Sequence, residues 1–260
     1  MNKLLKHALS LNQLRKTVGV ARLRGSMKID FRFKILKDPP GDKILVLSPH
    51  PDDDAFALGG TLSKYTKAKK YVSVLYLSEG LHGTKDGSLN PDLKEIRQKE
   101  ARCAAEILGI KDIRFWEESS EEIKKDKEAK QHLKELILEL NCDTIYVPSP
   151  FDNHLTHRRT AEILADTIAK NVNLPIKIVM GYEVWSPTFA NRIIDINDTV
   201  EQKKKAMACH KSQLACREFD KAILGLNQYR AEINGISGYA EGFLQTAPDT
   251  FAKLFEIANR

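Results

Sequence analysis

The chain has 260 residues, of which 42% are hydrophobic and 29% are charged, and its formal net charge is +6. Its length fits a single α/β domain with a substantial core, and no apolar run reaches the roughly 20 residues needed to cross a bilayer. Residues 1–28 hold seven basic and no acidic residues, so the remaining 34 basic and 35 acidic residues nearly balance. This distribution excludes a broad face for binding nucleic acid.

Residues 1–28 place apolar residues at helical spacing between Lys and Arg, which predicts an amphipathic basic helix. Three roles stay open for this helix. It packs on the domain or on another subunit of a homo-oligomer, contacts an anionic membrane surface, or directs the chain to an organelle. Two prolines and a glycine in residues 38–42 then break the chain. We therefore expect an N-terminal extension over residues 1–42 and one domain over residues 43–260.

Predicted strands and helices alternate through the main domain. Apolar or β-branched runs predict strands at 44–47, 72–77, 113–116, 143–148, 176–180 and 193–196. Helical patterns occur around 96–108, 120–140, 158–170, 199–214, 220–231 and 249–258. This alternation indicates a single α/β domain with a mostly parallel, Rossmann-like sheet flanked by helices on both faces.

The turn after the first predicted strand carries one histidine and three aspartates, namely His50, Asp52, Asp53 and Asp54. Imidazole and carboxylate groups are ligands that zinc and similar cations accept. Carboxylates packed this closely repel one another unless a cation offsets their charge. The turn therefore predicts half of a metal site. A dinucleotide-binding protein would need a glycine-rich loop here, but the paired glycines come about ten residues later.

The loop after the predicted strand at 143–148 carries His154 and His157. Two histidines three residues apart at a loop-to-helix junction can face one cavity. Ligand crevices in open α/β sheets form beyond the carboxyl ends of strands, where both motifs would lie. We therefore predict a single metal site for Zn²⁺, or for another divalent cation such as Fe²⁺. Spacing alone leaves open whether Asp52 or Asp53 is the ligand.

These motifs resemble the LmbE/PIG-L family of zinc-dependent N-acetylglucosaminyl deacetylases. The resemblance rests on His-Pro-Asp-Asp at 50–53, Leu-Gly-Gly-Thr at 58–61 and His-Leu-Thr-His at 154–157, with weaker matches over residues 43–245. It implies a fold of this family, and it implies removal of an acetyl group from a GlcNAc-containing small molecule or glycoconjugate. The alternative is a non-catalytic relative that binds zinc or carbohydrate.

The resemblance also implies a role for each residue of the two main motifs. His50, Asp53 and His157 would hold the zinc ion. Asp52 would be the general base, which takes a proton from the attacking water and later delivers it to the departing amine. His154 would stabilise the oxyanion as an imidazolium.

Arg97 matches a family arginine that contacts sugar hydroxyls. Thr156 stands where many members of the family have an aspartate that sets the charge state of the neighbouring histidine, and Asp152 is a candidate replacement. Asp54 stands where many members have glutamate, which changes the support of the ligands and not the ligands themselves. Three further residues are candidates for lining a sugar pocket: His82, Trp185 and His210.

The four cysteines show no CxxC spacing and are too sparse for a disulfide framework. Reduced thiols are typical of a cytoplasmic protein. We therefore expect a cytoplasmic chain with four free cysteines: Cys103, Cys142, Cys209 and Cys216.

Overall fold

A computed structural model of the chain describes residues 32–86, 88, 90–116, 123 and 127–258. The helix expected in residues 1–28, and with it the proposed contacts with a membrane or another subunit, lies outside these residues. No described helix is both long and apolar enough to span a membrane.

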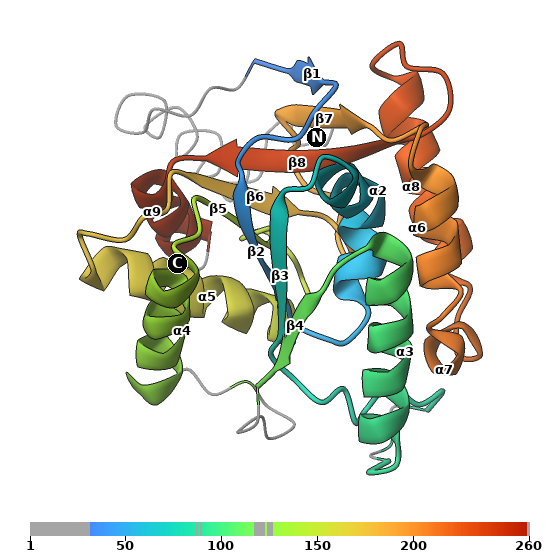
Figure 1. Cartoon of the computed structure of the whole chain (residues 1–260), viewed down its shortest axis with the longest axis horizontal. Helices are drawn as coiled ribbons and strands as arrows, with labels where there is room; N and C mark the ends of the chain where they lie inside the picture. The colour runs from blue at the N-terminus through green and yellow to red at the C-terminus, as the bar shows by residue number, and fades with distance from the viewer. Residues whose placement is uncertain (1–31, 87, 89, 117–122, 124–126, 259–260) are drawn as a thin grey trace, which may run out of the picture. The chain divides into compact units, whose positions relative to one another are not determined.

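In the described part of the chain, eight strands form one mixed sheet in the order β1-β7-β8-β6-β5-β2-β3-β4 (Figure 1). β8 runs antiparallel to its neighbours β6 and β7, and the other pairs are parallel. This sheet confirms the mostly parallel α/β fold. The strands are β1 (Lys34–Leu36), β2 (Lys43–Ser48), β3 (Tyr71–Tyr76), β4 (Asp112–Phe115), β5 (Thr144–Pro148), β6 (Ile178–Tyr182), β7 (Arg192–Asp195) and β8 (Ala240–Thr246).

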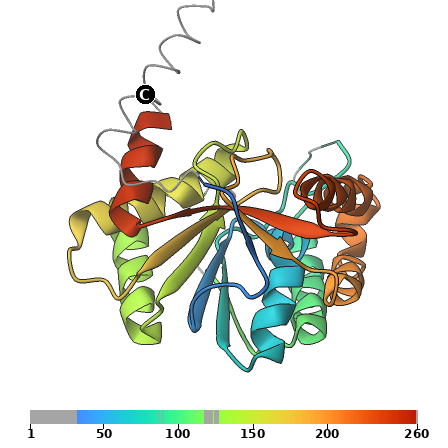
Figure 2. The ribbon, with the colours of Figure 1, turned by 90° about the horizontal axis from the view of Figure 1, so that it is seen from above.

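Helices cover both faces of the sheet, as Figure 2 shows from above. α2, α3, α6 and α8 pack together on one face, and α4, α5 and α9 pack together on the other. The helices are α2 (Asp53–Lys67), α3 (Leu93–Leu108), α4 (Lys127–Leu140), α5 (Leu155–Lys170), α6 (Val200–Met207), α7 (Lys211–Leu214), α8 (Phe219–Glu232) and α9 (Pro248–Ala258).

β2 is a central strand that is buried on both sides. Ile44 and Val46 belong to the core that includes α2 and α3, whereas Leu45 and Leu47 belong to the core that includes α5 and α9. A parallel strand covered on both faces appears in the sequence as an unbroken apolar run. The run stops where β2 leaves the core, so the polar turn that follows lies at the edge of the sheet.

Two segments differ from their expected boundaries. Residues 34–36, which the sequence pattern placed in the N-terminal extension, form β1 and pair with β7. The helix expected over 199–214 is divided into α6 and α7, and His210 is the residue that precedes α7.

Cys103 on α3 and Cys209 after α6 form a disulfide, with their Cα atoms 6.0 Å apart. This corrects the expectation of four reduced thiols, since free thiols remain at Cys142 and Cys216. The bonded cysteines are 106 positions apart in the sequence. They meet because α3 packs against α6, and no short spacing in the sequence marks such a pair.

Candidate metal centre

The two predicted motifs lie side by side at one edge of the sheet. β2 and β5 are neighbouring parallel strands, so the segments that follow Ser48 and Pro148 leave the sheet at the same carboxyl end. This end is where open α/β sheets form their ligand crevices. The structure therefore brings together the five residues predicted from the two motifs: His50, Asp52, Asp53, His154 and His157.

Hydrogen bonds within the turn hold the residues between β2 and α2 in place. Ser48 Oγ donates to the carbonyl oxygen of His50 (2.7 Å) and accepts from the backbone N–H of Asp54 (3.2 Å). Asp53 Oδ2 accepts from the backbone N–H of His50 (2.9 Å). The imidazole and the carboxylates are thus oriented by the turn itself, which is what a preorganised site requires.

Three side-chain atoms, which we call the ligand triangle, approach one another closely. His50 Nδ1 lies 3.0 Å from Asp53 Oδ2, and His157 Nε2 lies 3.3 Å from both of these atoms. Neighbouring ligands of a tetrahedral zinc ion are about 3.3 Å apart when the zinc–ligand distances are about 2.0–2.1 Å. The two nitrogens and one oxygen therefore fit three corners of a zinc tetrahedron.

The charges of the ligand triangle depend on one another. Burial raises the pKa of Asp53, but the charges of His157 and His50 outweigh burial and lower this pKa well below its usual value. Burial lowers the pKa of His157, yet Asp53 and Asp152 raise it to about 10. His157 therefore holds a proton at neutral pH unless a metal displaces it, because a ligating imidazole must be neutral. The two carboxylates beside His157, Asp53 and Asp152, therefore favour a positive charge in the ligand triangle, whether a proton or a metal ion carries it.

Asp152 supports His157 and not the His154 side chain. Its Oδ2 lies 3.3 Å from His157 Nδ1, and its Oδ1 accepts from the backbone N–H of His154 (2.8 Å). A carboxylate beside the second nitrogen of a ligating histidine fixes the orientation of that ring. His154 Nδ1 is buried without a hydrogen-bond partner among the described residues. Asp152 therefore raises the pKa of His157 from direct contact and acts on the His154 ring only through its charge.

The His154 ring packs against those of His50 and Trp185, with centroid distances of 5.0 and 5.2 Å and interplanar angles of 89° and 71°. Burial, together with nearby His50 and His157, lowers the pKa of His154 to about 4. His154 is therefore neutral at neutral pH, which corrects the expectation of an imidazolium. A neutral imidazole still donates one N–H hydrogen bond.

Arg97 reaches Asp52 from α3 and is only 3% exposed. Its Nη2 lies 2.8 Å from Asp52 Oδ1, and its Nη1 donates to the carbonyl oxygen of Gly80 (2.9 Å). Gly80 has a φ of +68°, and a Cβ there would lie 2.3 Å from Arg97 Nη1. Only glycine allows this approach, so the loop after β3 and α3 together hold the Arg97–Asp52 pair.

Asp54 points away from the ligand triangle. Its Oδ2 accepts from the hydroxyl of Tyr76 (3.1 Å), and burial raises its pKa to about 7. The side chain is fully buried. Asp54 thus anchors the start of α2 to β3 and supports the turn that carries the ligands.

The site opens into a cavity of about 420 Å³, which is within the size range of small-molecule sites. Of the additional candidates, His82 and Trp185 line this cavity, whereas His210 is buried and does not. Phe56 and Phe219 also line it and were missed. Phe56 has the sequence pattern of a core residue, and no sequence signal places Phe219, which reaches the cavity from the start of the distant α8.

Known proteins resemble the chain in sequence. Residues 45–168 match the family model described as PIG-L, GlcNAc-PI de-N-acetylase. Diacetylchitobiose deacetylase of Thermococcus kodakarensis is 30% identical over 255 residues, which cover 89% of this chain and 92% of the relative. A probable N-acetyl-alpha-D-glucosaminyl L-malate deacetylase 2 of Bacillus anthracis is 27% identical over 190 residues, covering 67% and 82% of the two chains.

The fold is also shared with a solved structure. N,N'-diacetylchitobiose deacetylase from Pyrococcus horikoshii has a TM-score of 0.72 and 24% identity, over 89% of this chain and 93% of that chain. The family model spans both motifs that build the ligand triangle, and the Thermococcus relative extends the match over most of the chain. The chain therefore belongs to the PIG-L family, whose model is described as GlcNAc-PI de-N-acetylase.

Proposed function

We propose that this chain is a metal-dependent hydrolase that removes the N-acetyl group from a GlcNAc-containing substrate. The relatives are named for deacetylation of diacetylchitobiose and of GlcNAc-malate, and GlcNAc is the part that these substrates share. The observation that carries the proposal is the ligand triangle, whose edges of 3.0–3.3 Å suit a tetrahedral metal. It lies in a cavity of substrate size with Asp52 beside it.

His50, Asp53 and His157 hold the metal in this proposal, with Zn²⁺ as the first choice. Three protein ligands leave one position of a zinc tetrahedron open, as in other catalytic zinc sites. A bound zinc ion would lower the pKa of a water molecule to about 7 and polarise the acetamide carbonyl. Fe²⁺ accepts the same imidazole and carboxylate donors, so reconstitution experiments must include both metals.

Asp52 is the proposed general base. Arg97 binds its Oδ1 at 2.8 Å, which leaves Oδ2 to accept a proton from the attacking water. Asp52 then gives this proton to the amide nitrogen while the C–N bond breaks, and acetate and a free amino sugar leave. Arg97 keeps the carboxylate in one orientation through both transfers, and its place in the cavity wall lets it also contact sugar hydroxyls.

His154 is proposed to stabilise the negative charge that develops on the acetamide oxygen. As a neutral imidazole it donates a single N–H to this oxygen. Its Nδ1 is buried, so Nε2 is the ring nitrogen proposed to carry this N–H into the cavity that His154 lines. The role is electrostatic and does not require His154 to exchange a proton.

Acetate release from a panel of GlcNAc conjugates tests this function. We expect turnover by the zinc- or iron-loaded chain, loss of turnover with a chelator, and recovery when the metal is restored. Asp52→Asn should lower kcat by about 10²–10⁴-fold and keep the metal. The matched control is Glu95→Gln, an exposed carboxylate on α3 with a side chain 82% exposed, which should leave kcat unchanged.

Two results would contradict the proposal. Full turnover by Asp52→Asn would show that another group acts as the base. Zinc binding without acetate release from any conjugate would identify a non-catalytic relative that binds zinc or carbohydrate.

A further inference from the structure

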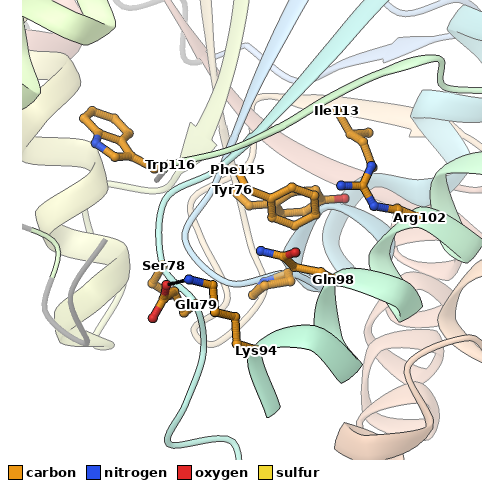
Figure 3. A pocket seen from close by; sticks show the side chains of 10 residues that line it. Tyr76, Ser78, Glu79, Lys94, Gln98, Arg102, Ile113, Phe115 and Trp116 are labelled. Atoms are coloured by element: carbon orange, nitrogen blue, oxygen red, sulfur yellow. Dashed lines mark ion pairs between the residues drawn. The ribbon is translucent and has the colours of Figure 1, made fainter. Parts of the chain in front are cut away.

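A second cavity, of about 420 Å³, lies between α3 and the ends of β3 and β4 (Figure 3). Pro51, from the turn that carries His50 and Asp52, lines this second cavity. Ser78 lines both it and the cavity of the metal centre. The two cavities therefore adjoin across the end of β3 and the turn after β2.

Aromatic rings form one wall of the second cavity. The rings of Tyr76 and Phe115 stack with their centroids 4.9 Å apart and an interplanar angle of 24°. The guanidinium carbon of Arg102 lies 5.1 Å from the centroid of the Phe115 ring. A planar cation above an aromatic ring is held in orientation by the ring, and Figure 3 shows Arg102 beside this aromatic pair.

Three polar side chains reach this cavity from one side of α3. Lys94, Gln98 and Arg102 are spaced four residues apart, so they lie along one face of the helix. Lys94 pairs with Glu79 across the cavity edge. Among the described residues, no carboxylate pairs with Arg102, and no side chain or backbone group is hydrogen-bonded to the amide of Gln98.

The charges of the described residues that line this cavity sum to one excess positive charge. Lys94 and Glu79 neutralise each other, and Arg102 remains. Its guanidinium offers the paired N–H groups that match a carboxylate or phosphate, and the Gln98 amide one helical turn away offers a further donor. The aromatic wall excludes water from one side of such a contact, which strengthens it.

We propose that the second cavity binds a carboxylate or phosphate group of a small molecule through Arg102 and Gln98. Because this cavity adjoins the metal centre, the acceptor attached to GlcNAc is one source of this group, and a free anion is the other. The assignment of this group to the acceptor rests on the proposed deacetylase function, whereas the proposal that the cavity binds an anion does not.

The first experiment compares two GlcNAc conjugates that differ only in a carboxylate on the acceptor and its neutral amide. The measured quantity is the ratio of kcat/KM for the acidic conjugate to that for the neutral one. Arg102→Gln should lower this ratio about tenfold, the loss expected for one charge-assisted hydrogen bond. Lys99→Gln removes the same charge from an exposed position of α3 that does not line the second cavity (side chain 78% exposed) and should keep the ratio.

The second experiment needs no turnover. Isothermal titration measures the Kd of succinate and of its neutral diamide for the whole chain in buffer with 0.15 M salt, chosen to screen surface charges. Succinate should bind about tenfold more weakly to Arg102→Gln than to the unchanged chain or to Lys99→Gln, and the diamide should not bind. Retained thermal unfolding of each variant excludes a folding defect.

The two experiments distinguish the outcomes. A change in the kinetic ratio assigns the site to the acceptor, and a change in succinate affinity alone assigns it to a free anion. The proposal is overturned if Arg102→Gln changes neither quantity, or if Lys99→Gln changes both as much. Absence of turnover with normal succinate binding would reject the deacetylase function and keep the binding site.

Discussion

Two of the buried clusters of charged side chains in the described part of the chain differ in whether the chain itself completes them. One is the pair of Lys203 and Glu241, whose side chains are 0% and 1% exposed. The other is the ligand triangle at the metal centre. Burying charge costs free energy in both places. The contrast lies in whether other groups of the chain pair with the buried charges and hydrogen-bond to them.

The Lys203–Glu241 pair is complete. Lys203 Nζ lies 2.6 Å from Glu241 Oε1, and Glu241 accepts from the backbone N–H groups of Gly60 (3.0 Å) and Thr61 (2.8 Å). α2 is interrupted at Leu58, whose φ of −136° is not helical. A helix that restarts after a kink exposes N–H groups, and a carboxylate satisfies them. This pair therefore explains the kink and fixes α2 behind the metal centre.

The ligand triangle is incomplete. Its three atoms lie within 3.3 Å of one another, and a proton on His157 is the positive charge that the chain supplies there. Further support comes from outside the triangle, from Asp152. A cluster that is oriented by its neighbours, and whose counter-charge is a proton that a metal can displace, is arranged for a ligand, whereas a cluster closed by its own residues stabilises the fold.

The largest effect is expected from opening the triangle. Asp53→Asn removes the charged ligand, so acetate release should fall about 10³-fold or more, since the metal supplies several kcal/mol of transition-state stabilisation. Zinc should raise the Tm of the unchanged chain, because it binds only the folded state, and should no longer do so in the variant. A zinc-dependent rise in Tm that persists in Asp53→Asn would contradict the assignment of Asp53 as a ligand.

Breaking the complete pair should affect stability instead. Lys203→Met leaves Glu241 buried without a cation, and we expect a loss of about 3–5 kcal/mol in the free energy of unfolding, measured by urea denaturation. The double variant Lys203→Met/Glu241→Gln removes both charges and should recover part of this loss. If the single variant is within about 1 kcal/mol of the unchanged chain, the pair does not stabilise the fold as argued.

The sequence predicted that the two motifs of the triangle meet because they obey a rule that links sequence to position, whereas the choice of Asp53 over Asp52 came from the family resemblance. His50 and His157 follow strands whose apolar runs are evident, and parallel strands bring their carboxyl ends to one edge. Asp152 was a candidate partner for a neighbouring histidine, but its contact with His157 could not be predicted, because this distance depends on how the loop turns between them. The protonation state of His154 was likewise hidden, since it depends on burial and on neighbouring histidines.

The complete pair shows the same limit for the fold. Alternating strands and helices predicted the parallel sheet, but β8 carries Glu241 into the sheet antiparallel to its neighbours. Lys203 lies in a strongly charged helix whose pattern is typical of a surface, yet its side chain is fully buried. Contacts between residues this far apart have no local signature, as the Cys103–Cys209 disulfide also shows.

A smaller effect is expected from the support of the triangle. Asp152→Asn keeps the shape of the side chain but removes the charge beside His157 Nδ1, so zinc affinity should fall about 10–100-fold. Competition with a chelating dye measures this affinity. The control Asp166→Asn changes a carboxylate on the same helix as His157 that pairs with Lys130 and should leave the affinity unchanged. Equal affinities for both variants would show that Asp152 does not support the ligand.

The smallest effect, taken per pH unit, is a dependence of zinc affinity on pH. His157 has a pKa of about 10 in the metal-free chain, so zinc must displace its proton throughout the range from pH 6 to pH 8 chosen for the titration. Zinc affinity should therefore rise about tenfold per pH unit, which is about 1.4 kcal/mol. His154, with a pKa of about 4, is neutral in this range and adds nothing to the slope.

The sign of this dependence follows from competition between the proton and zinc for His157. In the metal-free chain the raised pKa of His157 stabilises the fold at pH values below about 6.5, and this contribution is lost as the pH rises through about 10. Over the same pH interval zinc affinity rises, because fewer His157 side chains hold a proton that zinc must displace. Asp152→Asn should lower the pKa of His157 and so flatten the slope. A slope near zero in the unchanged chain would mean that His157 is already neutral without zinc, and would contradict the competition between the proton and zinc for this ring.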